Sequence, residues 1–207
     1  MRSSLGLIVI SVVLWIGFLS VSNAKSVNLY SSAGTENIDL YTFTAATTGE
    51  IGAYFYNSEA VYTNTLVLLV NGVITPESAA GVLNNHTSSK GDFVNLGSVQ
   101  AGDVLTFQLN VLTTGRTFYS DKLLNADGVN HVYSTLFSGD AAHGIPTGTY
   151  VGFEDLRGGG DRDYDDEAFI FTNIVIPVVP EPETSAMLLA GLGLLGLMAR
   201  HRKESQV

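Results

Sequence analysis

Seven carboxylates and two arginines crowd into the segment from Gly152 to Glu167, which gives it a local net charge of −5. Asp161, Asp163 and Asp165 alternate there, so in a tight loop their oxygens can converge on one hard cation. Calcium takes about six to eight oxygen ligands in flexible geometry, whereas magnesium retains several waters. The glycines just before Asp161 permit a sharp bend and offer backbone carbonyls. The spacing therefore predicts a calcium site in this loop.

A second interpretation of the same segment stays open. Aspartates in loops often make turns and accept hydrogen bonds from their own backbone, with no metal present. The segment is not an EF-hand, because no glycine follows Asp165 and no glutamate occupies the twelfth loop position. A solvated acidic turn is thus the alternative to a calcium site.

An enzymatic role is the weaker hypothesis. A glycosidase needs two carboxylates that face one cleft. Glu154 and Asp155 are adjacent, and neighbouring residues of a strand point to opposite faces. The chain has no G-x-S-x-G motif, no H-E-x-x-H motif and no cysteine. We therefore expect no enzyme, and interpret His131 as a packed, hydrogen-bonded residue or a group behind the acidic loop.

The charge of the central part of the chain excludes one class of partner. Between Lys25 and Glu183 the chain has 19 acidic and 6 basic residues, a net of −13. Nucleic-acid binding requires a basic surface, so it is not expected. Cations and glycans fit better, and the aromatic cluster of Tyr54, Phe55, Tyr56 and Tyr62 could stack on sugar rings. Packing within the protein is the commoner use of such residues.

Segments of alternating polarity must position these groups. In Val104 to Val111, apolar residues recur at every second position, which predicts a strand with one buried face. Ala168 to Ile176 is almost continuously apolar and predicts a buried strand. Further predicted strands are Asp39 to Ala45, Ile51 to Tyr56, Leu66 to Val70 and Val132 to Phe137.

Turn residues separate the predicted strands. Asn71-Gly72 between apolar runs indicates a hairpin. Because no convincing amphipathic helix interrupts the strands, we expect an all-β fold, an antiparallel two-sheet sandwich that is jelly-roll-like.

The two ends of the chain indicate export. Arg2, an apolar run from Leu5 to Leu19 and small residues before Ala24 form the pattern of a secretory signal peptide over residues 1–24. At the other end, Pro180-Glu181-Pro182 precedes an apolar run from Ser185 to Ala199 and a basic end. The basic end is expected to stay cytoplasmic, with the domain outside.

The C-terminal pattern resembles the PEP-CTERM sorting tail of exported bacterial proteins. The matching parts are Pro180, Glu181 and Pro182, the Leu/Gly-rich run and the basic cluster Arg200 to Lys203. The resemblance implies a transmembrane sorting helix in residues 185–207 and processing by an exosortase. It also implies a setting of exopolysaccharide or biofilm matrix. The rest of the chain then divides into a β-sandwich domain over residues 25–176 and a linker over residues 177–184.

The acidic segment is similar to the end of a bacterial domain of unknown function, with the pattern G-F-E-D, then G-G-D-x-D-Y-N-D, then an apolar strand. The similar stretches are Gly152 to Leu156, Gly160 to Asp166 and Phe169, with Asp127 to Val132 upstream. The resemblance covers Gly91 to Ile176.

That resemblance implies a β-rich exported domain but no activity. It also implies a calcium site at Glu154, Asp155, Asp161, Asp163 and Asp166. Asp165 stands where the family usually has asparagine, which adds one negative charge. Taken together, we expect an exported cell-envelope or exopolysaccharide-matrix protein with a structural or adhesive role and calcium in this loop. A calcium-dependent carbohydrate-binding module is the alternative, and a glycoside-active enzyme is the weaker one.

Overall fold

The computed structural model describes residues 31, 33–176 and 190–192. The predicted signal peptide, the Pro-Glu-Pro linker and most of the predicted sorting helix lie outside these residues. Within the described part of the chain, no helix combines the length and the apolar character needed to cross a membrane.

Eleven strands and two short 3₁₀ helices make up the described domain. The strands are β1 (Phe43–Ala45), β2 (Gly49–Asn57), β3 (Asn64–Val70), β4 (Val73–Ile74), β5 (Phe93–Val99), β6 (Val104–Val111), β7 (Arg116–Tyr119), β8 (Val132–Phe137), β9 (Gly148–Phe153), β10 (Glu167–Thr172) and β11 (Ile174–Val175). The helices are η1 (Lys122–Leu124) and η2 (Ala141–His143).

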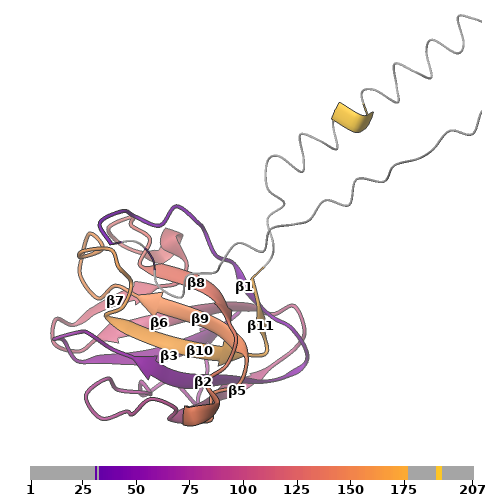
Figure 1. Cartoon of the computed structure of the whole chain (residues 1–207), viewed down its shortest axis with the longest axis horizontal. Helices are drawn as coiled ribbons and strands as arrows, with labels where there is room; N and C mark the ends of the chain where they lie inside the picture. Colours follow the sequence, from indigo (N-terminus) through magenta and orange to yellow (C-terminus); the bar gives the residue numbers. More distant parts are fainter. Residues whose placement is uncertain (1–30, 32, 177–189, 193–207) are drawn as a thin grey trace, which may run out of the picture.

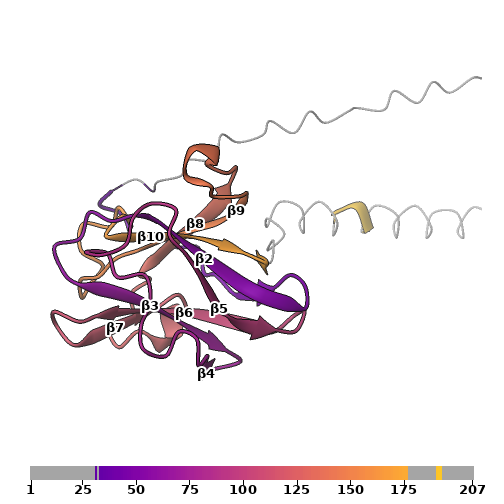
Figure 2. The same ribbon diagram turned by 90° about the horizontal axis from the view of Figure 1, so that it is seen from below.

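The strands form two antiparallel sheets, seen as two layers in Figure 2. One sheet has the order β11-β1-β6-β3-β4, with β7 paired to β6. The other has the order β5-β2-β10-β9-β8. The expectation of an all-β fold with two antiparallel sheets is therefore confirmed.

The core lies between the sheets and follows from the alternation of side chains along each strand. Leu66 and Leu68 of β3 face it from one sheet, and Phe169 and Phe171 of β10 face it from the other. The rings of Phe107 and Phe171 stack across the interface with centroids 3.8 Å apart. Burial of these apolar side chains drives the two sheets together.

Several predicted elements coincide with observed ones. The strands predicted over Val104–Val111 and Val132–Phe137 are β6 and β8. Asn71 and Gly72 both have positive φ, 50° and 82°, as the hairpin between β3 and β4 requires. The apolar run from residue 168 to 176 is divided at Asn173, whose φ of 60° ends β10 and lets β11 join the other sheet.

Four strands were not among the predicted ones: β5, β7, β9 and the two-residue β4, which forms the second arm of the predicted hairpin. In β9, from Thr149 onward, every side chain is buried, because the strand is central and both of its faces are covered. Such a strand shows no polar alternation in its sequence. A second apolar cluster, which includes Ile145 and Tyr150, covers the outer face of this sheet.

Candidate metal centre

The acidic loop connects β9 to β10, two neighbouring strands of one sheet. In Figures 1 and 2 it lies at the end of the sandwich opposite to the end where β11 leaves the domain. Because β9 ends at Phe153 and β10 begins at Glu167, both edges of the loop are fixed by the sheet.

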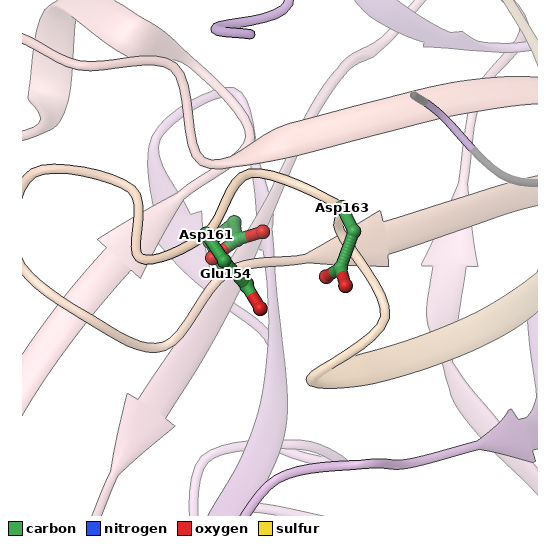
Figure 3. A group of neighbouring side chains, drawn as sticks. All are labelled: Glu154, Asp161 and Asp163. Atoms are coloured by element: carbon green, nitrogen blue, oxygen red, sulfur yellow. The ribbon is translucent and has the colours of Figure 1, made fainter. Parts of the chain in front are cut away.

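Glu154, Asp161 and Asp163 form a group in which each contributes an oxygen within 4.8 Å of the others (Figure 3). Glu154 follows β9 directly and is fully buried. Asp161 is exposed and Asp163 is half-buried, so the group has a buried base and an open mouth. These three hard oxygen ligands suit a calcium ion whose remaining ligands are water and backbone carbonyls.

The carboxylate of Glu154 is the least compensated group in the loop. Its Oε1 accepts a hydrogen bond from the backbone N–H of Tyr164 at 2.7 Å. Its buried Oε2 has no hydrogen-bond partner among the described residues. Burial raises the pKa of Glu154 to about 8, and the negative charges of Asp166, Asp161 and Asp163 contribute. A bound cation would offset this shift, because its positive charge stabilises the ionised carboxylate.

Tyr164 holds the loop in its conformation. Its ring is fully buried although its φ is +58°, an uncommon value for an aromatic residue. Its hydroxyl accepts a hydrogen bond from the backbone N–H of Asn37 at 2.7 Å. Gly160 has a φ of 47°, and a Cβ there would collide with Glu154 Oε2. The glycine is therefore needed both for the turn and for access to the carboxylate.

His131 lies behind the loop, as predicted. Its ring is buried and stacks on Phe118 with centroids 3.9 Å apart. Nδ1 donates to the backbone carbonyl of Glu154 at 3.0 Å, and Nε2 lies 3.1 Å from Asp127 Oδ2. Because both partners are acceptors, the ring makes both bonds only when both nitrogens carry a proton. Asp127 also accepts from the backbone N–H of Gly158, which ties this histidine to the acidic loop.

Asp155 and Asp166 belong to a different set of contacts. Asp155 is buried, and its Oδ2 accepts from the side-chain amide of Asn64 at 2.8 Å. Asp166 Oδ2 accepts from the backbone N–H of Asp155 at 2.8 Å. Burial and the neighbouring Asp155 raise the pKa of Asp166 to about 7. Of the six predicted ligands, the structure thus groups three, and these two make other contacts, although Asp166 remains close enough to Glu154 to raise its pKa.

Asp165 is half-buried beside Asp163. Burial, with that neighbouring carboxylate, raises the pKa of Asp165 to about 6. Its backbone carbonyl accepts from the N–H of Glu59, so the main chain here is tied to the segment after β2. Asp165 is not part of the group formed by Glu154, Asp161 and Asp163.

Sequence reasoning missed two site candidates, Glu167 and Asn64. Both are polar residues of types that usually lie on the surface. Both are fully buried. Glu167 was counted in the acidic segment, but nothing in its spacing distinguishes it. Asn64 has no sequence signal at all, because its importance depends on β3 lying opposite β10 in the other sheet.

The predicted aromatic cluster is divided between two faces. Phe55 is buried in the core between the sheets, whereas Tyr54 and Tyr56 pack on the outer face. Tyr54 contacts the exposed ring of Phe93, and the Lys90 ammonium lies 3.9 Å from the ring centre of Tyr56.

Comparison with known families adds two matches. Residues 73–172 match the model of a domain of unknown function (DUF4114). Residues 178–203 match the PEP-CTERM protein-sorting motif. No curated protein and no solved structure matches the chain. The central part of the chain is therefore similar to DUF4114 domains, and its C-terminal end is similar to the PEP-CTERM motif. That motif implies an exported protein with a C-terminal membrane-anchoring sorting signal that an exosortase processes.

Proposed function

We propose that this protein has a structural or adhesive role in the cell envelope or exopolysaccharide matrix, and that calcium stabilises its acidic loop. The observation that supports calcium is the fully buried Glu154 Oε2, which lacks a hydrogen-bond partner among the described residues and lies next to Asp161 and Asp163. The sorting motif supports the envelope setting.

The physical argument is one of uncompensated charge. An ionised carboxylate without partners is costly to bury, and two more carboxylates beside Glu154 increase that cost. A divalent cation neutralises the group and draws Asp161 and Asp163 toward the end of β9. The loop between β9 and β10 is then held closed by an ion instead of by a disulfide, in a chain that has no cysteine.

The position of the loop fits such a role. It lies at the end of the domain opposite to β11, after which the chain continues toward the sorting motif. The loop end can therefore meet matrix material while the other end leads to the membrane-anchoring signal. We propose no catalytic role, because Glu154 and Asp155 lie on opposite sides of the extended segment.

The test is thermal and urea unfolding of the full-length chain in detergent, with calcium and with excess chelator. At about a hundredfold excess over the dissociation constant, calcium should add about 2.7 kcal/mol to the free energy of unfolding. The double variant Asp161→Asn/Asp163→Asn should lose the part of this gain that comes from the loop.

The control Asp39→Asn/Glu50→Gln changes the net charge equally at exposed positions outside the loop. It should respond to calcium like the wild type. An undiminished calcium response in the Asp161→Asn/Asp163→Asn variant would reject the proposed site.

A calcium-dependent carbohydrate-binding role is the second candidate, and one cavity favours it. A pocket of about 440 Å³ lies beside the loop. It is lined by Arg116, Thr117, Phe118, Ala126, Asp127 and Arg157. Neither guanidinium forms an ion pair within the described part of the chain. Arg157 belongs to the acidic loop itself, so calcium would order one wall of this pocket.

Paired arginines beside an aromatic ring suit an acidic sugar, because guanidinium groups bind carboxylates in bidentate fashion. A glycan array probed with the full-length chain should show acidic glycans retained in calcium and released by chelator. Arg116→Ala/Arg157→Ala should remove this binding and leave the calcium-dependent melting shift intact. Retention that is indifferent to chelator and to both arginines would exclude this candidate.

A further inference from the structure

The core of the sandwich ends in polar side chains near the acidic loop. In β10, Phe169 and Phe171 face the core, and Glu167 is the preceding residue of the same alternating series. Glu167 pairs in register with Phe153 of β9, which also faces the core. Glu167 therefore points between the two sheets, and it is fully buried there.

The opposite sheet contributes an asparagine to the same place. Leu66 and Leu68 of β3 face the core, and Asn64 begins that alternating series. Asn64 is fully buried and donates through Nδ2 to Asp155 Oδ2 at 2.8 Å. Asp155 follows β9 in the other sheet, so this hydrogen bond joins the two layers at their polar end.

Acceptors outnumber donors in this cluster. Both carboxylate oxygens of Glu167 are buried without a hydrogen-bond partner among the described residues, and so is Asn64 Oδ1. Burial raises the pKa of Glu167 to about 9. The nearby side-chain amide of Asn64 opposes this rise, and the negative charges of Asp155 and Asp166 add to it. A buried oxygen without a partner destabilises the folded state, and more so when it is charged. The cluster is therefore incomplete without a positive group.

We propose that Glu167, Asp155 and the side-chain carbonyl of Asn64 form a second cation site, between the sheets and separate from the group at Glu154. Its oxygen ligands and two carboxylates match a divalent hard cation, and calcium tolerates such irregular geometry. The proposal rests on the proposed function only for the choice of calcium. An ion at this position links β10 and the end of β9 to β3, so it fastens one sheet to the other.

Adjacent residues explain why one acidic segment serves two sites. Glu154 and Asp155 point to opposite sides of the extended chain. Glu154 meets Asp161 and Asp163 in the open loop, whereas Asp155 meets Asn64 inside the sandwich.

The test counts calcium ions bound to the full-length chain by native mass spectrometry from detergent. The wild type should bind two. Glu167→Gln should bind one, and so should Asp161→Asn/Asp163→Asn, because each variant removes a different site. Combining the three substitutions should leave none. Glutamine preserves the volume of Glu167 and removes its buried charge, and circular dichroism checks that the variant folds.

The outcomes separate this inference from the proposed function. A single ion that is lost in Asp161→Asn/Asp163→Asn and kept in Glu167→Gln would overturn the second site alone. A single ion that is lost in Glu167→Gln and kept in Asp161→Asn/Asp163→Asn would support the second site and reject the loop site. No bound ion would reject both.

If Glu167→Gln does not fold, the number of ions bound to Asp161→Asn/Asp163→Asn tests the second site instead. One ion retained in Asp161→Asn/Asp163→Asn supports the second site, and none contradicts it. Asp155→Asn then serves as the second variant and should lower the count by one.

Discussion

Glu154 Oε1 accepts a hydrogen bond from the backbone N–H of Tyr164 at 2.7 Å, which closes the acidic loop onto the end of β9. The same carboxylate leaves its other oxygen, Oε2, free of hydrogen bonds among the described residues. One oxygen therefore holds the loop, and the other is left for the cation that we propose. This division of roles explains why a fully buried glutamate occupies a position next to two further carboxylates.

Tyr164 should be a principal support of the loop. Tyr164→Ala empties a fully buried aromatic site and should lower the free energy of unfolding by about 3–5 kcal/mol. Tyr164→Phe keeps the ring and the positive φ but loses the bond from Asn37 and the bond to the Asn130 carbonyl, so it should cost about 1–2 kcal/mol. Urea unfolding in calcium measures both variants. Equal losses in both would show that the hydroxyl, and not the ring, supports the loop.

Two glycines of the loop provide a matched pair. Gly160→Ala should weaken calcium binding roughly tenfold, about 1.4 kcal/mol, because the new methyl group collides with Glu154 Oε2. Gly158 also has a positive φ, 83°, but nothing lies within 4 Å of a Cβ there. Gly158→Ala should therefore cost only the backbone strain, about 1–2 kcal/mol of stability. Calcium titration of both variants makes the comparison, and unchanged affinity in Gly160→Ala would contradict this role of Glu154.

Without calcium, the protein should lose stability as the pH rises. The folded state raises the pKa of Glu154 from 4.5 to about 8 and that of Glu167 from 4.5 to about 9. Between the ordinary pKa of each group and its raised pKa in the folded state, the folded chain holds protons that the unfolded chain releases. The free energy of unfolding therefore decreases as the pH rises through this range.

Melting temperatures in chelator, measured from about pH 5 to about pH 9, test this prediction. Calcium should reduce the decline, because the ion replaces the protons. Glu154→Gln/Glu167→Gln should make the decline shallower in chelator, because only the smaller pKa shifts of Asp165 and Asp166 then remain. A melting temperature that climbs over this range in chelator would be inconsistent with buried, uncompensated carboxyl groups.

His131 should matter for stability far more than His143. His131→Leu removes bonds to the Glu154 carbonyl and to Asp127, and leaves both acceptors without them, at a cost of about 2–3 kcal/mol. His143 is partly exposed and pairs with Asp140, so His143→Leu should change stability by less than about 1 kcal/mol. Urea unfolding compares the two. A similar cost for both would mean that the bonds of His131 contribute little.

Local patterns in the sequence determined much of this protein. The alternation in Val104 to Val111 is a property of a strand with one buried face, and it specified β6 residue by residue. The Asn71-Gly72 turn likewise depends on backbone conformations that few other residues adopt. The sorting motif and the acidic loop could also be recognised from the sequence, because each consists of residues that are neighbours in the chain.

Only the tertiary structure decided how the acidic residues are grouped. Glu154 and Asp155 are consecutive in the chain, yet one meets Asp161 and Asp163 and the other meets Asn64. The contact with Asn64 spans 91 residues and depends on how β3 faces the second sheet. The pairing of two sheets sets such contacts through packing over the whole core, and no local pattern encodes them.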